Sequence, residues 1–382
     1  MPSTINGRLT TMTKGAVIPT CLSDYEDLAA QALPPQTWAY VNSGAADEHT
    51  FARNQHAFKD ISLLPRHLCA MQGASTALEV CGTALDYPIL LAPVAYQKLA
   101  HADGEHASAL AASAMRAGMV VSTLSSVSLE DIAQTASTAL WFQLYLQPDK
   151  ADSLALMRRA EAAGYQALVI TVDAAVNGCR NAEQRAGFAL PSHISAVNLN
   201  GRQTPSPGIS IPAGESLFQS PHIARLPDWS DIGWAIEQSR LPVLVKGIMS
   251  PQDARRAIQA GASGLIVSNH GGRVLDTVPA TIDVLPAIAD AANGAPVLLD
   301  GGIRRGTDVL KALALGARAV LLGRPITHGL AVNGPSGVAH ILHILRTEFE
   351  MAMVQCGCRT LADIDQSVLW APAPFRLPAD NI

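Results

Sequence analysis

Charged and aromatic residues are scarce in this sequence: they make up 15% and 5% of its 382 residues, and the formal net charge is -5. Lysines and arginines do not gather in a basic run, the electrostatic feature that nucleic-acid binding requires. Long apolar runs are also lacking, and no stretch approaches the roughly 20 residues of a transmembrane helix. We therefore expect neither a nucleic-acid partner nor a membrane partner.

Cysteine is rare and scattered along the chain. The six cysteines are Cys21, Cys69, Cys81, Cys179, Cys356 and Cys358. The last two are separated by one residue, which is not the spacing of a zinc knuckle. The first twenty residues lack the apolar core of a signal peptide. We expect reduced thiols, no bound metal and a cytoplasmic protein.

What the sequence does contain is a regular alternation of apolar runs and alanine-rich stretches, and its 48% hydrophobic content suits a substantial core. Candidate strands cover residues 89–92, 119–123, 141–144, 167–172, 243–245, 265–267, 296–299 and 319–322. Helical stretches between them include 104–117, 128–135, 151–163, 251–260 and 307–315. This α/β pattern predicts an eight-stranded parallel (β/α)8 TIM barrel. The alternative is a doubly wound open sheet, which should carry a G-x-G-x-x-G turn where this chain has Pro93-Val94-Ala95.

Two segments fall outside the alternation. Residues 1–86 are interpreted as an N-terminal helical cap, whose first helix would be capped by Ser23 with Glu26 in the capping-box position. Residues 178–228 form a connecting segment after the fourth strand, and residues 190–227 within it are rich in Pro, Ser and Gly. A connection of that length is typical of a lid or a disordered segment. We expect residues 1–382 to form one barrel domain with this cap and lid.

Polar side chains follow nearly every candidate strand, at the end where barrel enzymes carry their chemistry. They are Ser125, Gln143, Tyr145, Thr171, Asp173, Lys246, Ser268, His270, Arg273, Asp300, Arg304 and Arg324. A barrel end with a purely structural role would not need such convergence. We therefore expect a binding or catalytic site at this end.

The last two strands predict a phosphate site. Asp300-Gly301-Gly302 is followed by Arg304, and Gly323 by Arg324. Glycines let backbone N–H groups turn towards an anion, and arginine supplies bidentate donors. The alternative is a pair of glycine turns with solvated arginines.

The strands on the other side of the barrel end in hydroxyl, amide and ammonium groups that could hydrogen-bond the rim of a planar heterocycle. These groups belong to Ser125, Gln143, Thr171 and Lys246. Lys246 could instead form a Schiff base or a structural ion pair. Asp173 could orient the imidazole of His270, or simply cap a helix. The segment from Ser268 to Arg273 could take a proton from an anionic substrate, or be a loop with a capping serine and surface His and Arg.

Taken together, these motifs resemble the FMN-dependent 2-hydroxy-acid oxidase and dehydrogenase family, which includes glycolate, lactate and hydroxymandelate oxidases and mandelate dehydrogenase. The most specific motif is Ser268-Asn269-His270-Gly271-Gly272-Arg273, followed by Leu275-Asp276. Supporting motifs stand in the family's order: residues 91–98, 142–145, 171–173 and 300–306. The resemblance covers most of the chain, from about residue 25 to residue 358.

The resemblance implies a role for each matching residue. The catalytic residues would be His270, Asp173 and Tyr145. The substrate would be held by Tyr40, Arg180, Arg273 and Tyr145. FMN would be bound by Pro93, Val94, Ala95, Ser125, Gln143, Thr171, Lys246, Ser268, Asp300, Gly301, Gly302, Arg304, Gly323 and Arg324. A homotetramer is also implied.

Val127 stands where we align the tryptophan of glycolate oxidase, so we expect it in the substrate site and expect a substrate larger than glycolate. The function so implied is oxidation of a lactate-like or mandelate-like (S)-2-hydroxy acid to the 2-oxo acid. Ala95 favours oxygen as the electron acceptor, with hydrogen peroxide formed. Alternatives are a dehydrogenase that passes electrons to a quinone or carrier protein, a flavin-free phosphate-binding lyase or isomerase, and a non-catalytic phosphometabolite-binding barrel.

Overall fold

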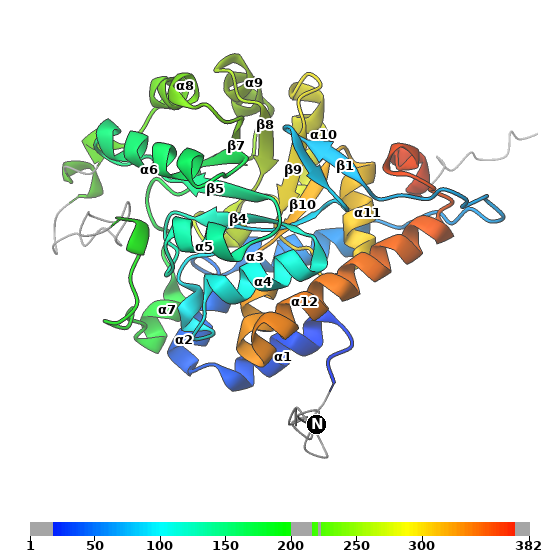
Figure 1. Cartoon of the computed structure of the whole chain (residues 1–382), viewed down its shortest axis with the longest axis horizontal. Coiled ribbons are helices and arrows are strands. Elements are labelled where there is room, and N and C mark those ends of the chain that lie inside the picture. The colour runs from blue at the N-terminus through cyan, green and yellow to red at the C-terminus, as the bar shows by residue number, and fades with distance from the viewer. Residues whose placement is uncertain (1–17, 200–215, 221–222, 371–382) are drawn as a thin grey trace, which may run out of the picture.

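In a computed structural model, which describes residues 18–199, 216–220 and 223–370, eight parallel strands close into a barrel in the order β10-β3-β4-β5-β6-β7-β8-β9 (Figure 1). The strands are β3 (Ile89–Leu91), β4 (Gly118–Ser122), β5 (Leu140–Leu144), β6 (Ala167–Thr171), β7 (Val243–Ile248), β8 (Gly264–Val267), β9 (Val297–Asp300) and β10 (Ala319–Leu322). The ends of each strand lie within a few residues of the ends of its predicted range. The predicted TIM barrel is confirmed.

A short antiparallel hairpin, β1 (Leu78–Val80) and β2 (Thr83–Leu85), closes the N-terminal end of the barrel. Val80 and Leu85 pack into the apolar interior of the barrel, against side chains such as Trp141 near the start of β5. The indole Nε1 of Trp141 donates a hydrogen bond to Thr83 Oγ1 at 2.9 Å. The polar ends of the strands therefore form the barrel's other mouth.

Helices surround the barrel. Those that follow strands are α4 (Glu105–Met115), α5 (Leu129–Thr135), α6 (Lys150–Ala162), α8 (Trp229–Gln238), α9 (Pro251–Gln259), α10 (Thr281–Ala291) and α11 (Gly306–Ala314). The chain then enters α12 (Arg324–Gln355), which is interrupted by non-helical Asn333 and Gly334. Long α12 packs along α1 and α4 (Figure 1). It joins the N-terminal cap to the barrel.

The cap contains α1 (Leu22–Ala32), α2 (Pro35–Asn42) and α3 (His49–His56). The predicted Ser23 cap is wrong, because α1 begins at Leu22 and Ser23 already lies in its first turn. Asp24 accepts the backbone N–H groups of Thr20 and Cys21 at 2.7 and 3.1 Å, so the carboxylate takes the role expected of the serine. In the predicted lid, α7 (Asn181–Ala186) is helical, whereas residues 200–215 and 221–222 lie outside the described residues.

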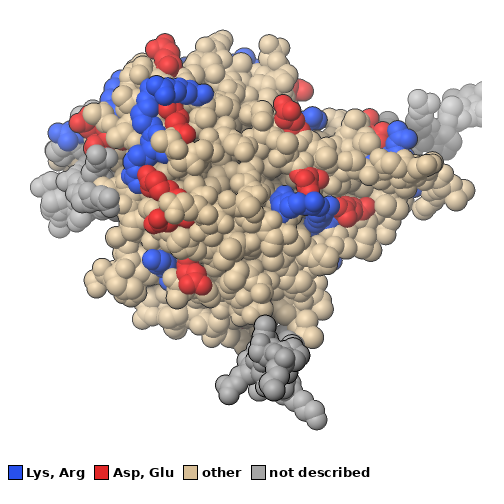
Figure 2. Space-filling view, in the orientation of Figure 1, with Lys and Arg blue, Asp and Glu red and all other residues tan. Residues whose placement is uncertain are grey.

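Most of the face shown in Figure 2 is uncharged, and its charged residues stand in small groups in which basic side chains lie beside acidic ones. Ion pairs such as Arg116 with Asp86, at 2.7 Å, join opposite charges at the surface. Within the described ranges, no helix has the length and apolar character needed to cross a bilayer.

Candidate active site

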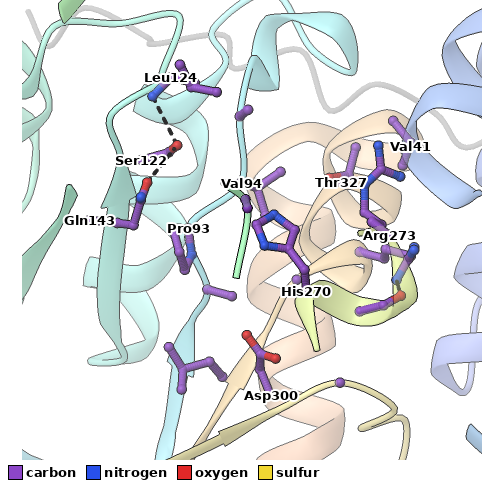
Figure 3. Close-up of a pocket in the computed structure, with 18 of the residues that line it drawn as sticks. Val41, Pro93, Val94, Ser122, Leu124, Gln143, His270, Arg273, Asp300 and Thr327 are labelled. Atoms are coloured by element: carbon purple, nitrogen blue, oxygen red, sulfur yellow. Dashed lines mark hydrogen bonds between the residues drawn. The ribbon is translucent and has the colours of Figure 1, made fainter. Parts of the chain in front are cut away.

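A cavity of about 360 Å³ opens at the C-terminal ends of the barrel strands, which is the size of a small-molecule or cofactor site. Figure 3 shows His270 and Asp300 pointing into it from different strand ends. Predicted site residues that line the cavity are Tyr40, Pro93, Val94, Ala95, Gln143, Tyr145, Thr171, Arg180, Lys246, His270, Arg273, Asp300, Gly301, Gly302, Arg304, Gly323 and Arg324. The structure thus brings together residues that are up to 284 positions apart in the sequence, Tyr40 and Arg324 being the extremes.

His270 is held by Asp173. Its Nδ1 donates to Asp173 Oδ1 at 2.8 Å, which leaves Nε2 as the ring nitrogen that can exchange a proton with a ligand. Burial alone would raise the pKa of Asp173, but His270 and Lys246 together lower it below its ordinary value of 3.8. The ionised carboxylate therefore orients the imidazole.

The backbone that carries His270 has an unusual conformation. His270, Gly271 and Gly272 all lie in the left-handed region, with φ of 56°, 62° and 75°. A Cβ on Gly272 would stand 2.7 Å from the backbone nitrogen of Phe51 in α3, so only glycine fits there. These constraints explain the glycine pair in the motif after β8.

Lys246 forms an ion pair in the cavity wall. Its Nζ lies 3.0 Å from Asp300 Oδ2 and donates to Ser268 Oγ at 2.7 Å, and the two charged side chains are only 5% and 9% exposed. Burial alone would lower the pKa of Lys246, but the charges of Asp300 and Asp173 raise it above its ordinary value. A Schiff-base lysine needs the neutral amine, so this geometry opposes the alternative in which Lys246 forms a Schiff base.

Two arginines meet at the side of the cavity nearest the cap. Arg273 Nη1 donates to the carbonyl oxygens of Tyr40 and Ser43 at 2.7 and 2.9 Å, and its guanidinium stacks on the Tyr40 ring at 5.2 Å. Arg180, at the start of α7, shares with Arg273 the carboxylate of Glu183. Burial, with the charge of Arg180, lowers the pKa of Arg273. Sequence reasoning missed Glu183, because an acidic residue on a short helix gives no signal of its own.

Arg304 and Arg324 line the part of the cavity that lies beyond β9 and β10. Arg324 donates to the carbonyl oxygens of Gly271 and Ser43 at 2.9 and 2.7 Å and stacks on Phe51. Arg304 Nε lies 3.6 Å from Glu26 Oε2 of α1. The cap therefore supports both arginines, a contact that sequence reasoning did not predict. Burial, reinforced by Arg273 and Arg304, lowers the pKa of Arg324 well below its ordinary value.

Several buried polar atoms of the cavity wall lack a hydrogen-bond partner among the described residues. They are Gln143 Nε2, Thr171 Oγ1, Asp300 Oδ1, Arg304 Nε and Arg324 Nε. Such groups are costly unless a ligand satisfies them. Amide and hydroxyl groups on one side, with guanidinium groups on the other, fit a planar polar heterocycle joined to an anionic group. The residues present therefore fit FMN.

Four predicted site residues are absent from the cavity wall: Asp173, which acts on it through His270, and three that were expected to contact the cofactor or the substrate. Ser125 donates to the carbonyl oxygen of Val127 at 2.7 Å, and Ser268 is occupied by Lys246. Val127 is 5% exposed and packs in the core outside the barrel. The expectation that it faces the substrate is corrected: the tight turn after β4 directs Leu124 into the cavity instead. The serines at positions 125, 126 and 128 give no sequence signal for which apolar neighbour faces the cavity.

Comparisons with known proteins identify the family of the chain. The sequence pattern of the FMN-dependent dehydrogenase family matches residues 29–371. The chain is 48% identical to an L-lactate oxidase of Alicycliphilus denitrificans over 347 residues, which cover 91% of this chain and 95% of the relative. It is 42% identical to a glycolate oxidase of Spinacia oleracea over 349 residues, with 91% and 95% covered. The crystal structure of a mandelate oxidase with benzoyl-formic acid superposes with a TM-score of 0.84 at 39% identity, covering 92% of this chain and 98% of that one.

Proposed function

Since the chain belongs to the FMN-dependent dehydrogenase family and is an FMN-dependent 2-hydroxy-acid oxidase, we propose that its substrate is an (S)-2-hydroxy acid with a lactate-like or mandelate-like side chain. The product is the 2-oxo acid. Oxygen accepts the electrons and is reduced to hydrogen peroxide, as the names of the oxidase relatives support. The observation that carries the proposal is one cavity that holds a carboxylate-oriented histidine beside a pair of arginines.

The substrate carboxylate is held by Arg180 and Arg273, because guanidinium groups bind carboxylates through paired donors. Tyr40, whose ring stacks on Arg273, closes this side of the site. Tyr145 contacts the substrate hydroxyl. Burial raises the pKa of its phenol, so it stays a neutral donor. His270 removes a substrate proton through Nε2 while Asp173 holds the ring in place.

FMN supplies the two-electron acceptor when bound. Gln143 and Thr171 satisfy the rim of its ring system, Lys246 places a positive charge beside it, and Arg304 and Arg324 hold its phosphate with the glycines after β9 and β10. The backbone at Pro93, Val94 and Ala95 forms the wall against the ring.

The substrate side chain meets an apolar surface. Leu124, Tyr96, Phe188 and Leu190 line the cavity, and Phe188 stacks on Tyr40 with ring centroids 4.4 Å apart. Apolar walls favour side chains larger than the hydrogen of glycolate, because burial of each additional CH₂ contributes about 0.8 kcal/mol.

The test is a panel of glycolate, lactate, 2-hydroxyoctanoate and both enantiomers of mandelate, with oxygen uptake and peroxide measured in parallel. Release of FMN on denaturation is recorded for the same preparation. Lactate or (S)-mandelate should give the highest kcat/KM with stoichiometric peroxide. Preference for glycolate, or turnover only with a quinone or dye acceptor, contradicts the proposal.

The assembly and location are part of the same proposal. A homotetramer is supported by the family resemblance and is measured by size-exclusion chromatography with light scattering. A cytoplasmic location is supported by the six cysteines, which are all free thiols, the state that a reducing compartment maintains.

A further inference from the structure

A carboxylate of the chain itself joins the two arginines of the substrate site. Glu183 lies one helical turn after Arg180 in α7. Its Oε1 accepts from Arg180 Nη1 at 3.2 Å and from Arg273 Nη2 at 2.9 Å. The side chains of Glu183, Arg180 and Arg273 are 14%, 18% and 15% exposed. One oxygen atom of Glu183 therefore joins the guanidinium group of Arg273, in the loop after β8, to that of Arg180, the residue before α7.

Glu183 lies behind the arginines and not in front of them. Both arginines line the cavity, whereas Glu183 is not among the lining residues. Arg273 uses Nη1 for two cap carbonyls and one Nη2 hydrogen for Glu183. Arg180 keeps a buried Nε that has no partner among the described residues. The contacts with Glu183 thus leave donors on both arginines for an anion in the cavity.

Backbone contacts alone place Arg180 and Arg273 close together. A Cβ on Gly178 would lie 2.2 Å from Val274 O and 2.7 Å from Arg273 O, so the segments preceding α7 and following β8 are in direct contact. The carbonyl oxygen of Cys179 accepts from Ala46 N at 2.6 Å, which fixes the same segment to the cap. The backbone sets the spacing of the arginines. The cap carbonyls hold Arg273 Nη1 and Asn177 Oδ1 accepts from Arg180 Nη2 at 3.4 Å, and Glu183 adds a contact that both guanidinium groups share.

Two partly buried guanidinium groups at this spacing repel each other. A carboxylate between them offsets one positive charge and accepts a hydrogen bond from each. We propose that Glu183 is a positioning residue, which aligns Arg180 and Arg273 as one receptor for the carboxylate of the substrate. This inference rests on the proposed function, because it assigns the arginine pair to a 2-hydroxy acid.

The proposal separates binding of the carboxylate from the rest of the reaction. Glu183→Gln keeps the size of the side chain but turns an amide NH₂ group towards an arginine and removes the charge. KM for the 2-hydroxy acid should rise by about tenfold or more, the effect of losing one charge-assisted hydrogen bond, and kcat should fall by a smaller factor. Glu183→Asp keeps the charge but is one methylene shorter, so its KM should lie between those of the parent and the Gln variant.

The discriminating measurement is kcat/KM for the 2-hydroxy amide of the same acid, which has no carboxylate. It should change by less than about twofold in Glu183→Gln, with FMN content unchanged. Gln184, exposed on the same helix, gives the matched control, and Gln184→Ala should behave as the parent with both substrates. Equal losses with acid and amide would mean that Glu183 only supports the fold of α7. An unchanged or lower KM for the acid would mean that Glu183 competes with the substrate for the arginines. Either result overturns the proposal.

A binding experiment keeps this inference separate from the proposed function. The FMN-loaded parent and Glu183→Gln are titrated calorimetrically with the 2-oxo acid, which requires no turnover. Weaker binding by about tenfold in the variant supports the positioning role even if the parent oxidises none of the acids tested. Equal affinity in the two proteins refutes it, whatever the activity of the parent.

Discussion

Replacement of Leu124 by tryptophan should move substrate preference towards smaller 2-hydroxy acids. Leu124 follows β4 and lines the cavity (Figure 3). Its backbone N–H donates to Ser122 Oγ at 3.1 Å, and Ser122 in turn donates to Gln143 Oε1 at 3.3 Å. Because these bonds fix the backbone, a larger side chain at position 124 must extend into the cavity.

The size of the effect follows from the apolar surface that the substrate would lose. Each CH₂ of the substrate that is denied burial costs about 0.8 kcal/mol, which is about fourfold in kcat/KM. An indole that displaces the equivalent of two methylenes therefore costs about 1.6 kcal/mol, or about 15-fold. The ratio of kcat/KM for 2-hydroxyoctanoate to that for lactate should fall by this factor in Leu124→Trp.

The control is Val127→Ala, at the position three residues further along the same loop. Val127 is buried in the core, so its truncation should cost about 2 kcal/mol of stability and leave the ratio of the two substrates unchanged. Steady-state kinetics and thermal unfolding are measured on all three proteins. An unchanged ratio in Leu124→Trp, or a shifted ratio in Val127→Ala, would refute the assignment of Leu124 to the substrate wall.

Three further predictions concern the polar residues. His270→Ala should keep FMN but lose about 10²–10⁴-fold in turnover, because the base is absent; near-parent flavin reduction in stopped-flow experiments would contradict this. Arg273→Lys should raise KM for the acid without loss of FMN, since lysine lacks the planar fork, and loss of FMN with unchanged KM would place Arg273 in the cofactor site. The pKa of Asp173 is lower in the folded protein than its ordinary value of 3.8. Above pH 3.8 its ionised carboxylate therefore stabilises the fold, and this contribution is lost as the pH falls through the lower folded value. The difference in unfolding temperature between the parent and Asp173→Asn should therefore be largest near neutral pH and shrink below about pH 4, and a pH-independent difference would show that the charge does not contribute.

The barrel was predictable because its strands are buried on both faces. Such strands form short continuous apolar runs, and the glycines and prolines around them mark where each ends. The polar residues after each run share one mouth of the barrel, so Gln143, Lys246 and His270 could be assigned to one site before any contact was known. Parallel topology alone supplies that information.

Other features depend on contacts that leave no local pattern. Helix α12 contains Asn333-Gly334-Pro335, a sequence typical of a turn, and its packing against α1, α4 and α11 leaves no mark in that sequence. The loop after β4 offers several serines among which an alignment can shift, and hydrogen bonds of the turn decide that Leu124 faces the cavity. Glu183 gains its significance from Arg273, 90 residues away.

The left-handed backbone of His270 gives this enzyme a built-in conflict between robustness and activity. A non-glycine residue at φ of 56° is destabilised by about 1–2 kcal/mol relative to ordinary helical geometry, and glycine would adopt the same conformation freely. Glycine at position 270 would relieve this strain but remove the imidazole, whereas the same change at Leu68 or Asn293, with φ of 62° and 49°, would leave the site intact. Attempts to engineer a hardier variant should take their gains from the outer helices and leave this loop strained.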